Sequence, residues 1–478
     1  MEKFSVCRAA VALCLVCAGP LPALAQTAPA SVPAAAQSLS FDAAWQQVKG
    51  GSERLLAARA AVQSKTLQGE GLQGLDGPTV TVAGASYAYS ATVDLNLDPV
   101  NQRLAQLGQA LPISLAKLLP PPSAIQLPQN YNYTSNTSDT RAWLSAMWPL
   151  YVGGATDATR AFVAAQAGEA QADEQRTEHE LMTQLVQRYF GSQLAAKAAQ
   201  LREAAYQNVA EHDRAVEKML TAGVVSRVER LQARAATEEA RRNAQKARDD
   251  ADLSTIALAR TVRAVASVAP DSPLFVSTTP VQPLAYFTEA ALLHHPGLAK
   301  VAAKKTQAEQ LHAGEQALRK PQLFAFAQHQ IATEHPDWVA GLGVRWTLFD
   351  ALDRDKLASA SLQQIAQAEH SDAQARSDIA LLIERNWRLL EQARRQFISL
   401  QPGVDVAQEV LRLRVAGLRE GTSTTMDLMD AETSVVKVQT ERAQAAYDYV
   451  VALANLLEGC GLSEQFATYM ARADVKVQ

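Results

Sequence analysis

The strong helix formers Ala, Gln, Leu and Arg dominate two very long stretches of the chain, which predicts α-helices there. The stretches cover about 155–222 and about 353–420, and each predicts a helix of about 100 Å at 1.5 Å per residue. A shorter helix is predicted after each, at about 225–262 and 424–459. Rods of this length far exceed the diameter of a small domain, so the pattern indicates an extended, mainly helical protein.

A glycine separates each long helix from the shorter helix that follows it. Gly223 and Gly421 tolerate the left-handed backbone conformation that ends many helices. Each shorter helix then opens with a capping box, in which a hydroxyl residue is followed three positions later by an acid. The two capping boxes are Ser226–Glu229 and Thr424–Asp427. We therefore expect Gly223, Ser226, Gly421 and Thr424 to form tight turns at the tips of two helical hairpins.

Alternating apolar and polar residues between the helices predict β-strands. The four strands are expected at about 79–97, 139–152, 321–332 and 338–349. In the first strand the alternation changes phase near Gly84, which predicts a β-bulge there. The segment 98–138 is rich in Pro, Asn and Gln, and it predicts a long loop with a short helix at about 101–119.

The fourth strand has one apolar face and one face of small or polar residues. Its apolar face carries Ala340, Leu342, Val344, Trp346 and Leu348, opposite Gly341, Gly343 and Arg345. This alternation is typical of strands in transmembrane barrels. Four strands cannot close a barrel, and an open sheet edge cannot face lipid, so several chains would have to share one barrel.

The chain contains the same pattern twice. A constant offset of 421 − 223 = 198 residues aligns the two copies without gaps from the second strand of each copy onward. It pairs Leu144 with Leu342, Trp148 with Trp346, Tyr189 with Trp387, and Leu258 with Leu456. A helix beginning at Phe41 opens the first copy, and a helix beginning at Phe287 opens the second. We interpret the chain as an internal duplication, with repeats at 41–268 and 287–459, a linker at 269–286 and a tail at 460–478.

The N-terminus has the features of a secretory signal peptide. Residues 1–25 contain a basic start, an apolar core and the small-residue cleavage site Ala23-Leu24-Ala25. The apolar run is too short to favour an uncleaved anchor. Residues 26–40, rich in Ala, Pro and Ser, predict a flexible leader. Only Cys460 follows the predicted cleavage site, so no internal disulfide framework is expected.

Composition and charge argue against several classes of function. The net charge of the 478 residues is −4 and no basic block stands out, so nucleic-acid binding has little support. No phosphate loop, nucleophile elbow or catalytic dyad occurs, so we expect neither an enzyme nor a cofactor site. His294 and His295 lack a carboxylate or cysteine at helical ligand spacing, so no metal site is expected.

Over nearly all of its expected mature length, the chain resembles the TolC family of outer-membrane efflux and secretion channels. The resemblance rests on the helices at Phe41 and Phe287, the strand ends 148–154 and 346–350, and the turn 420–431. It implies a homotrimer with a twelve-stranded outer-membrane β-barrel on a long α-helical barrel. It also implies a Gram-negative outer membrane, a periplasmic extension, and docking through the tips onto a periplasmic adaptor protein and an inner-membrane transporter.

The resemblance also suggests residues for the periplasmic entrance. Asp427 and Asp430 stand three apart on one helix face and match aspartates whose three-fold rings narrow the pore in the family. Acids near a helix N-terminus also interact favourably with the helix dipole, so a capping role for Asp427 and Glu229 is an open alternative. Leu418 and Ser423 occupy the positions of the polar latch known in the family. The closed state is therefore expected to depend on packing or on Arg227 and Glu229.

We therefore predict a passive conduit for substrates of an inner-membrane pump, serving either small-molecule efflux or type I secretion. The alternative is an exported coiled-coil structural or adhesion protein without a channel. Strands with one apolar face argue against that alternative, because a scaffold outside the membrane has no use for a lipid-facing surface.

Overall fold

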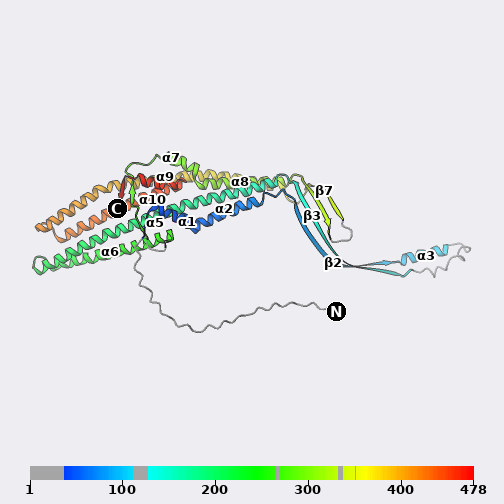
Figure 1. Cartoon of the computed structure of the whole chain (residues 1–478), viewed down its shortest axis with the longest axis horizontal. Coiled ribbons are helices and arrows are strands. Elements are labelled where there is room, and N and C mark those ends of the chain that lie inside the picture. Colours follow the sequence, from blue (N-terminus) through cyan, green and yellow to red (C-terminus); the bar gives the residue numbers. More distant parts are fainter. Residues whose placement is uncertain (1–36, 111–126, 265–267, 332–336, 350, 478) are drawn as a thin grey trace, which may run out of the picture.

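The computed structural model describes residues 37–110, 127–264, 268–331, 337–349 and 351–477. Figure 1 shows an elongated molecule, with long helices side by side and a β-sheet at one end. The predicted mainly helical fold with a small β component is confirmed. The predicted signal peptide, residues 1–25, lies outside the described residues.

Two helical hairpins form the main body. The first consists of α5 (Ala155–Thr221) and α6 (Arg227–Val262), and the second of α9 (Arg354–Glu420) and α10 (Thr425–Gly459). Both long helices have 67 residues, or about 100 Å. The hairpins lie against each other through α5 and α10, so α6 and α9 form the two outer edges. Among the described residues, every helix is too short or too polar to cross a lipid bilayer.

Four shorter helices run from the middle of the molecule towards the sheet. They are α1 (Phe41–Gly51), α2 (Glu53–Gly71), α7 (Leu284–His294) and α8 (Pro296–Ala317). The sequence predicted one continuous helix from Phe41 and one from Phe287, and both expectations were wrong. Ser52 and His295 have extended backbones that break the helices. Ser52 caps α2, and Pro296 disfavours a helical conformation at the residue before it.

An antiparallel sheet in the order β2-β3-β6-β7 lies beyond α2 and α8. Its strands are β2 (Thr79–Asn96), β3 (Asn130–Tyr151), β6 (Gln322–Gln330) and β7 (Trp338–Arg345). The second strand begins at Asn130 rather than near 139, so part of the predicted long loop is strand. The short helix in that region is α3 (Asp98–Ala110), and residues 111–126 lie outside the described part of the chain.

The predicted bulge near Gly84 is absent. The pairing of β2 with β3 runs without interruption from Thr79 opposite Met147 to Asn96 opposite Asn130. The irregularity in this sheet lies instead between Pro149 and Tyr151, where β3 pairs with β6. The change of phase in β2 therefore moves the apolar side chains from one face of the sheet to the other.

A compact core lies at the waist of the molecule, where the helices meet two small sheets. One sheet pairs β1 (Gln37–Leu39) with β4 (Val268–Pro270), and the other pairs β5 (Leu274–Val276) with β8 (Val475–Val477). The end of the predicted leader, the linker and the tail therefore all contribute structure at the waist. A short 3-10 turn (Ser463–Gln465) and α11 (Phe466–Arg472) complete it.

Aromatic rings fill this core. Phe41, Phe190 and Phe466 lie with their ring centroids 5.0–6.0 Å apart. The hydroxyl of Tyr189 donates to the carbonyl of Leu39 at 2.7 Å and accepts from the amide of Ser272 at 2.9 Å. Tyr189 thus connects the end of β1 and the segment that follows β4 to α5.

Cys460 lies in the same core, at the end of α10. Its Sγ donates to the carbonyl of Phe287 at 3.4 Å, and burial raises the pKa of its thiol to about 12. Because the thiolate is the reactive form, this cysteine is chemically inert in the folded chain.

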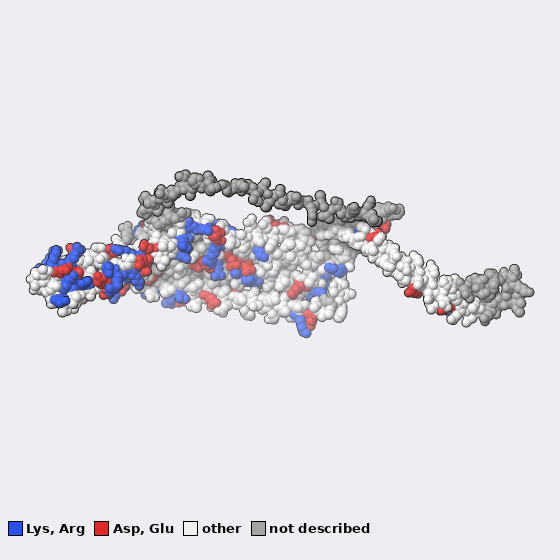
Figure 2. Space-filling model, turned by 90° about the horizontal axis from the view of Figure 1, so that it is seen from below, with Lys and Arg blue, Asp and Glu red and all other residues white. Residues whose placement is uncertain are grey.

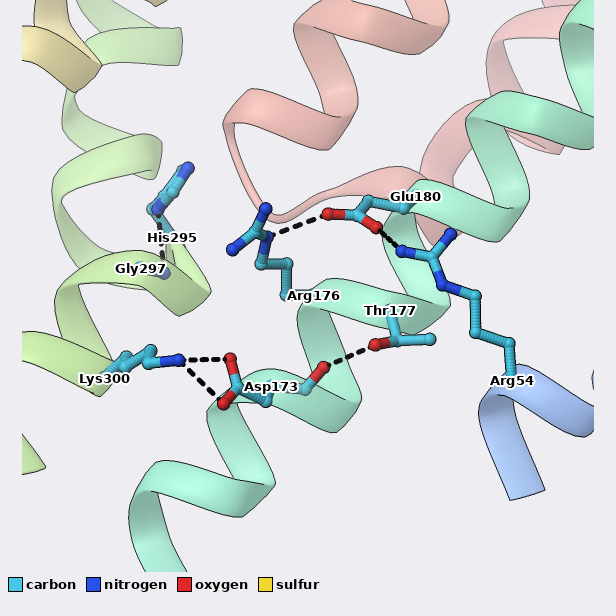
Figure 3. Close-up of polar contacts among 8 residues, drawn as sticks. All are labelled: Arg54, Asp173, Arg176, Thr177, Glu180, His295, Gly297 and Lys300. Atoms are coloured by element: carbon cyan, nitrogen blue, oxygen red, sulfur yellow. Dashed lines mark hydrogen bonds and ion pairs between the residues drawn. The ribbon is translucent and has the colours of Figure 1, made fainter. Parts of the chain in front are cut away.

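Charged side chains connect α8 and α2 to α5 on the side of the waist that leads to the sheet (Figure 3). Lys300 of α8 contacts both carboxylate oxygens of Asp173, at 2.9 and 2.8 Å. Glu180 of α5 bridges Arg54 of α2 and Arg176 of its own helix. The side chain of His295 caps α8, because its Nδ1 accepts the backbone N–H of Gly297 at 2.9 Å.

This cap requires a neutral imidazole, because a protonated Nδ1 cannot accept a hydrogen bond. Burial lowers the pKa of His295, and the nearby charges of His179 and Arg176 lower it further. Burial also lowers the pKa of His179, against the opposing influence of Glu178 and Glu464. The unfolded chain therefore binds protons at both sites at higher pH than the folded chain does.

We expect acid to destabilise the protein through these histidines. Their contribution is complete above the ordinary histidine pKa of about 6.5 and is lost as pH falls below it towards the lowered folded-state pKa. His295→Asn retains an acceptor at the cap but does not titrate. Thermal unfolding between pH 7.5 and 5.5 should therefore show a smaller loss for His295→Asn than for the wild type. The exposed neighbour His294→Asn is the control, and equal losses in all three proteins would contradict the assignment.

Candidate functional site

The end of the molecule farthest from the sheet consists of two glycine turns. In the first, Gly223 has a φ of 75°, and the amide of Val224 donates to the carbonyl of Met219 at 2.9 Å. Ser226 then begins α6: its Oγ accepts from the amide of Glu229 at 3.2 Å, and the Glu229 carboxylate accepts from the amide of Ser226 at 2.7 Å. The predicted capping box is therefore present.

The second turn has the same design. Gly421 has a φ of 79°, and the amide of Thr422 donates to the carbonyl of Gly417 at 2.8 Å. The hydroxyl of Thr424 accepts from the amide of Asp427 at 3.1 Å, and the Asp427 carboxylate accepts from the amide of Thr424 at 3.0 Å. Both predicted tips thus fold as two hydrogen-bonded turns, each followed by a capped helix.

Asp427 caps the N-terminus of α10, the structural role that the sequence had left open for it. Hydrogen bonds from the backbone and the side chain of Thr424 lower the pKa of Asp427, and the charge of Arg414 lowers it further. The Arg414 guanidinium lies 3.6 Å from the Asp427 carboxylate, across the hairpin. Asp427 is therefore ionised and held in place at neutral pH.

The other predicted entrance residues lie on the surface of the two tips. Asp430 is exposed one turn further along α10. Arg227 and Glu229 are exposed at the start of α6, and within the described residues neither contacts the second hairpin through a hydrogen bond or an ion pair. In this single chain they do not hold the hairpins together.

The contacts that do join the hairpins lie further from the tips. The side-chain amide of Asn208 on α5 donates to both carboxylate oxygens of Glu432 on α10, each at 3.2 Å. Glu432 is only 7% exposed. Beside it, Met429 of α10 packs into an apolar cluster with Val209, Val216 and Ala233 of the first hairpin.

The sequence did not identify these contacts. Asn208 and Glu432 are 224 residues apart, so no local spacing pattern relates them. Arg414 and Asp427 could have been paired, because they lie 421 − 414 = 7 and 427 − 421 = 6 residues from the turn glycine on facing helices. Arg230 could have been paired in the same way with Asp213 and Glu217 across the first turn.

A groove of about 810 Å³ separates the hairpins near these contacts. Acidic and basic side chains both line it, including Asp430, Glu432, Lys437, Arg202 and Glu239. Throughout the described residues, no cluster of three or more His, Cys, Asp or Glu side chains is arranged to hold a metal ion. The tips are therefore two capped turns that carry exposed charge, and behind them the Asn208–Glu432 contact and the Met429 cluster join the hairpins.

Residues 288–461 match the family model described as outer membrane efflux protein. The chain carries an outer membrane efflux protein domain. The second tip, with Gly421, Thr424, Asp427 and Asp430, lies inside this efflux domain, whereas the first tip lies outside the matched residues.

Individual proteins show the same relationship. The chain is 28% identical over 121 residues to the outer membrane efflux protein BepC of Brucella suis. The aligned segment spans 25% of this chain and about a quarter (26%) of that relative. The family resemblance drawn from the sequence is confirmed.

Solved channel structures share the fold of most of this chain. The chain matches CusC with a TM-score of 0.72 at 14% identity, over 88% of this chain and 91% of that chain. It matches the outer-membrane channel OprN with a TM-score of 0.71 at 15% identity, over 88% and 89%. It matches the outer-membrane channel CmeC of Campylobacter jejuni with a TM-score of 0.69 at 13% identity, over 90% and 89%.

The Asn208–Glu432 contact generates a prediction for the efflux domain. Asn208→Leu removes the amide and leaves a buried carboxylate without its hydrogen-bond partner, which costs about 1–3 kcal/mol. We expect a lower thermal unfolding midpoint for Asn208→Leu than for the wild type. Asn243→Leu, an exposed residue of α6 on the same groove, is the matched control. Equal midpoints for the two variants would show that the contact does not join the hairpins.

Proposed function

We propose that the protein is a passive outer-membrane channel-tunnel, which conducts substrates delivered by an inner-membrane pump to the exterior. The proposal rests mainly on the open edges of the single chain. The sheet ends at β2 and β7, and the helical layer ends at α6 and α9. The efflux domain and the fold shared with known channels support the same conclusion.

The sheet supports contact with lipid on one face. Val80, Val82, Leu144, Leu342 and Val344 lie on the same face and are all exposed in the single chain. The opposite face carries Thr79, Thr81, Ser145, Gln328 and the small residues Gly341 and Gly343, together with Met147, Phe324 and Phe326. One face is therefore more apolar than the other, which supports a wall between lipid and an aqueous channel. This arrangement favours the channel over the alternative of an exported scaffold or adhesin.

The uncovered edges support a homotrimer. β2 and β7 each pair with one strand only in the described chain, and three such sheets would give 3 × 4 = 12 strands. In the helical layer, exposed apolar residues lie along both outer helices. They include Leu231, Leu253 and Ile256 on α6, and Leu381, Leu389 and Val406 on α9. A ring closes if α6 and β2 of one copy meet α9 and β7 of the next.

The repeated element order supports an origin by internal duplication. Each half has helices leading to a pair of strands, then a 67-residue helix and a shorter return helix. Three chains would therefore present six hairpin tips to the periplasm. We propose that these tips, at Gly223, Ser226, Gly421 and Thr424, dock onto a periplasmic adaptor protein attached to an inner-membrane transporter.

We further propose that the acids of the second tip narrow the periplasmic entrance. In a trimer, Asp427 and Asp430 would form two rings of three carboxylates. Asp427 is held by its cap, so Asp430 is the residue with a free carboxylate for passing cations. Arg227 and Glu229 would lie on the neighbouring tips and would tune the charge of the same entrance.

Single-channel recordings test the entrance. We expect Asp427→Ala with Asp430→Ala to abolish the block of current by divalent or trivalent cations, because block requires closely spaced carboxylates. Asp448→Ala removes one acid from the same helix, 448 − 430 = 18 residues or about 27 Å further from the tip, and should retain the block. Unchanged block in the double variant would exclude these aspartates from the pore.

The cargo is tested by deleting the gene. The efflux family favours small molecules, so we expect greater drug susceptibility and an unchanged profile of secreted proteins. Re-introducing the gene should reverse the change. A changed secreted profile with unaltered susceptibility would instead assign the channel to type I secretion, and no change in either would contradict the proposed function.

A further inference from the structure

In the four-stranded sheet, β2 and β3 continue well past β6 and β7. β6 pairs with β3 only as far as Trp143 opposite Gln330, whereas β2 and β3 remain paired with each other up to Asn96 and Asn130. We call residues 85–96 and 130–141 the outer ribbon. Figure 1 shows this ribbon projecting beyond β6 and β7. It is two-stranded, and both of its edges lack a strand partner within the described residues.

The outer ribbon extends beyond the length that a membrane requires. A strand crosses the hydrocarbon core with about 9–11 residues. β6 and β7 have 9 and 8 residues, whereas β2 and β3 have 18 and 22. In the proposed channel the outer ribbon therefore stands in water on the external side. An isolated two-stranded ribbon is at best marginally stable in water.

Where the outer ribbon begins, the apolar side chains of β2 and β3 change from one face of the strand pair to the other. Near the base of the sheet, the face containing Val80, Val82 and Leu144 is apolar. In the outer ribbon that same face becomes wholly polar or small, with Ser86, Ala88, Ser90, Thr92, Asp94 and Asn96 opposite Thr140, Ser138, Asn136, Thr134, Asn132 and Asn130. Because the register is uninterrupted, these residues all continue one face.

Aromatic and aliphatic side chains gather on the other face of the outer ribbon. This aromatic face comprises Tyr87, Tyr89, Val93, Leu95, Tyr131 and Tyr133. The four tyrosines are 38–57% exposed in the single chain. Each face of the ribbon contains a contact between its own side chains. On the aromatic face, Tyr87 and Tyr89 stack with their ring centroids 6.4 Å apart. On the polar face, the hydroxyl oxygens of Thr92 and Thr134 lie 3.1 Å apart.

Lipid does not explain the aromatic face. The lipid-facing residues of the base, such as Val80 and Leu144, lie on the opposite face of the same pair of strands. The aromatic face instead continues the side that carries Thr79, Thr81 and Ser145, which faces the channel in the proposed trimer.

Charge does not prevent the aromatic face from packing against copies of itself. Charged residues are sparse on the sheet and the ribbon compared with the helices (Figure 2). Asp139 and Arg141 lie on this side at the start of the ribbon, where they form an ion pair at 2.6 Å. Tyr87 lies opposite Asp139 and donates its hydroxyl to that carboxylate at 3.3 Å. The same faces of the other two copies can therefore pack against the aromatic face without burying an unpaired charge.

We propose that the aromatic faces of three outer ribbons pack against one another around the trimer axis and narrow the external mouth of the channel. The inference rests on the proposed trimeric channel. The occupant of each aromatic face is thus the same face of another copy of this chain. Packing of six exposed aromatic and aliphatic side chains per chain stabilises ribbons that would be marginal alone.

Cysteine cross-linking in the trimer of the mature chain, without the predicted signal peptide, tests the contact. Val93→Cys places a thiol on the aromatic face, and Thr92→Cys places one on the polar face of the neighbouring position. The described part of the chain contains only one native cysteine, Cys460, and it is buried and inert. We expect a mild oxidant to convert Val93→Cys into disulfide-linked dimers of chains, and to leave Thr92→Cys unlinked. Comparable cross-linking of both variants, or of neither, would overturn the proposal.

Gel filtration in detergent separates this inference from the function on which it rests. If both variants are conducting trimers and Val93→Cys does not cross-link, the ribbon packing is wrong and the channel stands. If neither variant is a trimer although the wild type is, Tyr133→Cys, opposite Val93, repeats the test with a second side chain. If the wild type itself is a monomer without conductance, the proposed function has failed.

Conductance provides a second measurement. Replacing Tyr87, Tyr89, Tyr131 and Tyr133 with Ser should raise single-channel conductance, because it removes one of the two narrow points that lie in series along the proposed channel. Thr92→Ser with Thr134→Ser, on the polar face, should leave conductance unchanged. Labelling of the Val93→Cys variant with a soluble thiol reagent completes the test. Protection of the introduced thiol in whole outer membranes, but not in purified trimers, would assign the face to a different partner and overturn the proposal.

Discussion

The need to pair backbone hydrogen-bonding groups along the edges of β2 and β7 constrains everything else in this protein. An edge strand facing lipid would leave amide and carbonyl groups without partners, at a cost of several kcal/mol for each group. The four strands of one chain cannot satisfy this requirement by curling onto themselves. The helical layer also has open edges, because apolar side chains remain exposed along α6 and α9. These open edges are the reason why we propose that the chain forms one segment of a closed wall.

The fold was largely predictable because its signals are long. A run of helix-forming residues sustained over 67 positions cannot be mistaken for a strand, and the glycine and capping residues marked both turns. The breaks at Ser52 and His295 were missed, because a cap within a continuous helical pattern resembles any other polar residue. The change of phase near Gly84 was detected but misinterpreted. A bulge and an exchange of faces give the same local pattern, and only the pairing with β3 distinguishes them.

The candidate site was predictable to a smaller extent. The residues of the two tips were identified because their roles are local: Ser226 with Glu229 and Thr424 with Asp427 lie within one helical turn of each other. The contact between Asn208 and Glu432 could not be inferred, since it depends on how two hairpins pack. No repeating pattern along the sequence marks such contacts. They arise from tertiary packing and are visible only once the helices are placed.

One difference between the two long helices has a mechanical consequence. α9 contains Pro402, whereas α5, of equal length, contains no proline. Proline removes one N–H from the helical ladder and crowds the preceding turn, so α9 is the more compliant rod at that point. The segment from Pro402 to the end of α9 spans 420 − 402 = 18 residues, or about 27 Å. A bend of about 10° at Pro402 would move the tip of the second hairpin by about 5 Å. The second hairpin is therefore the more flexible of the two hairpins in the chain.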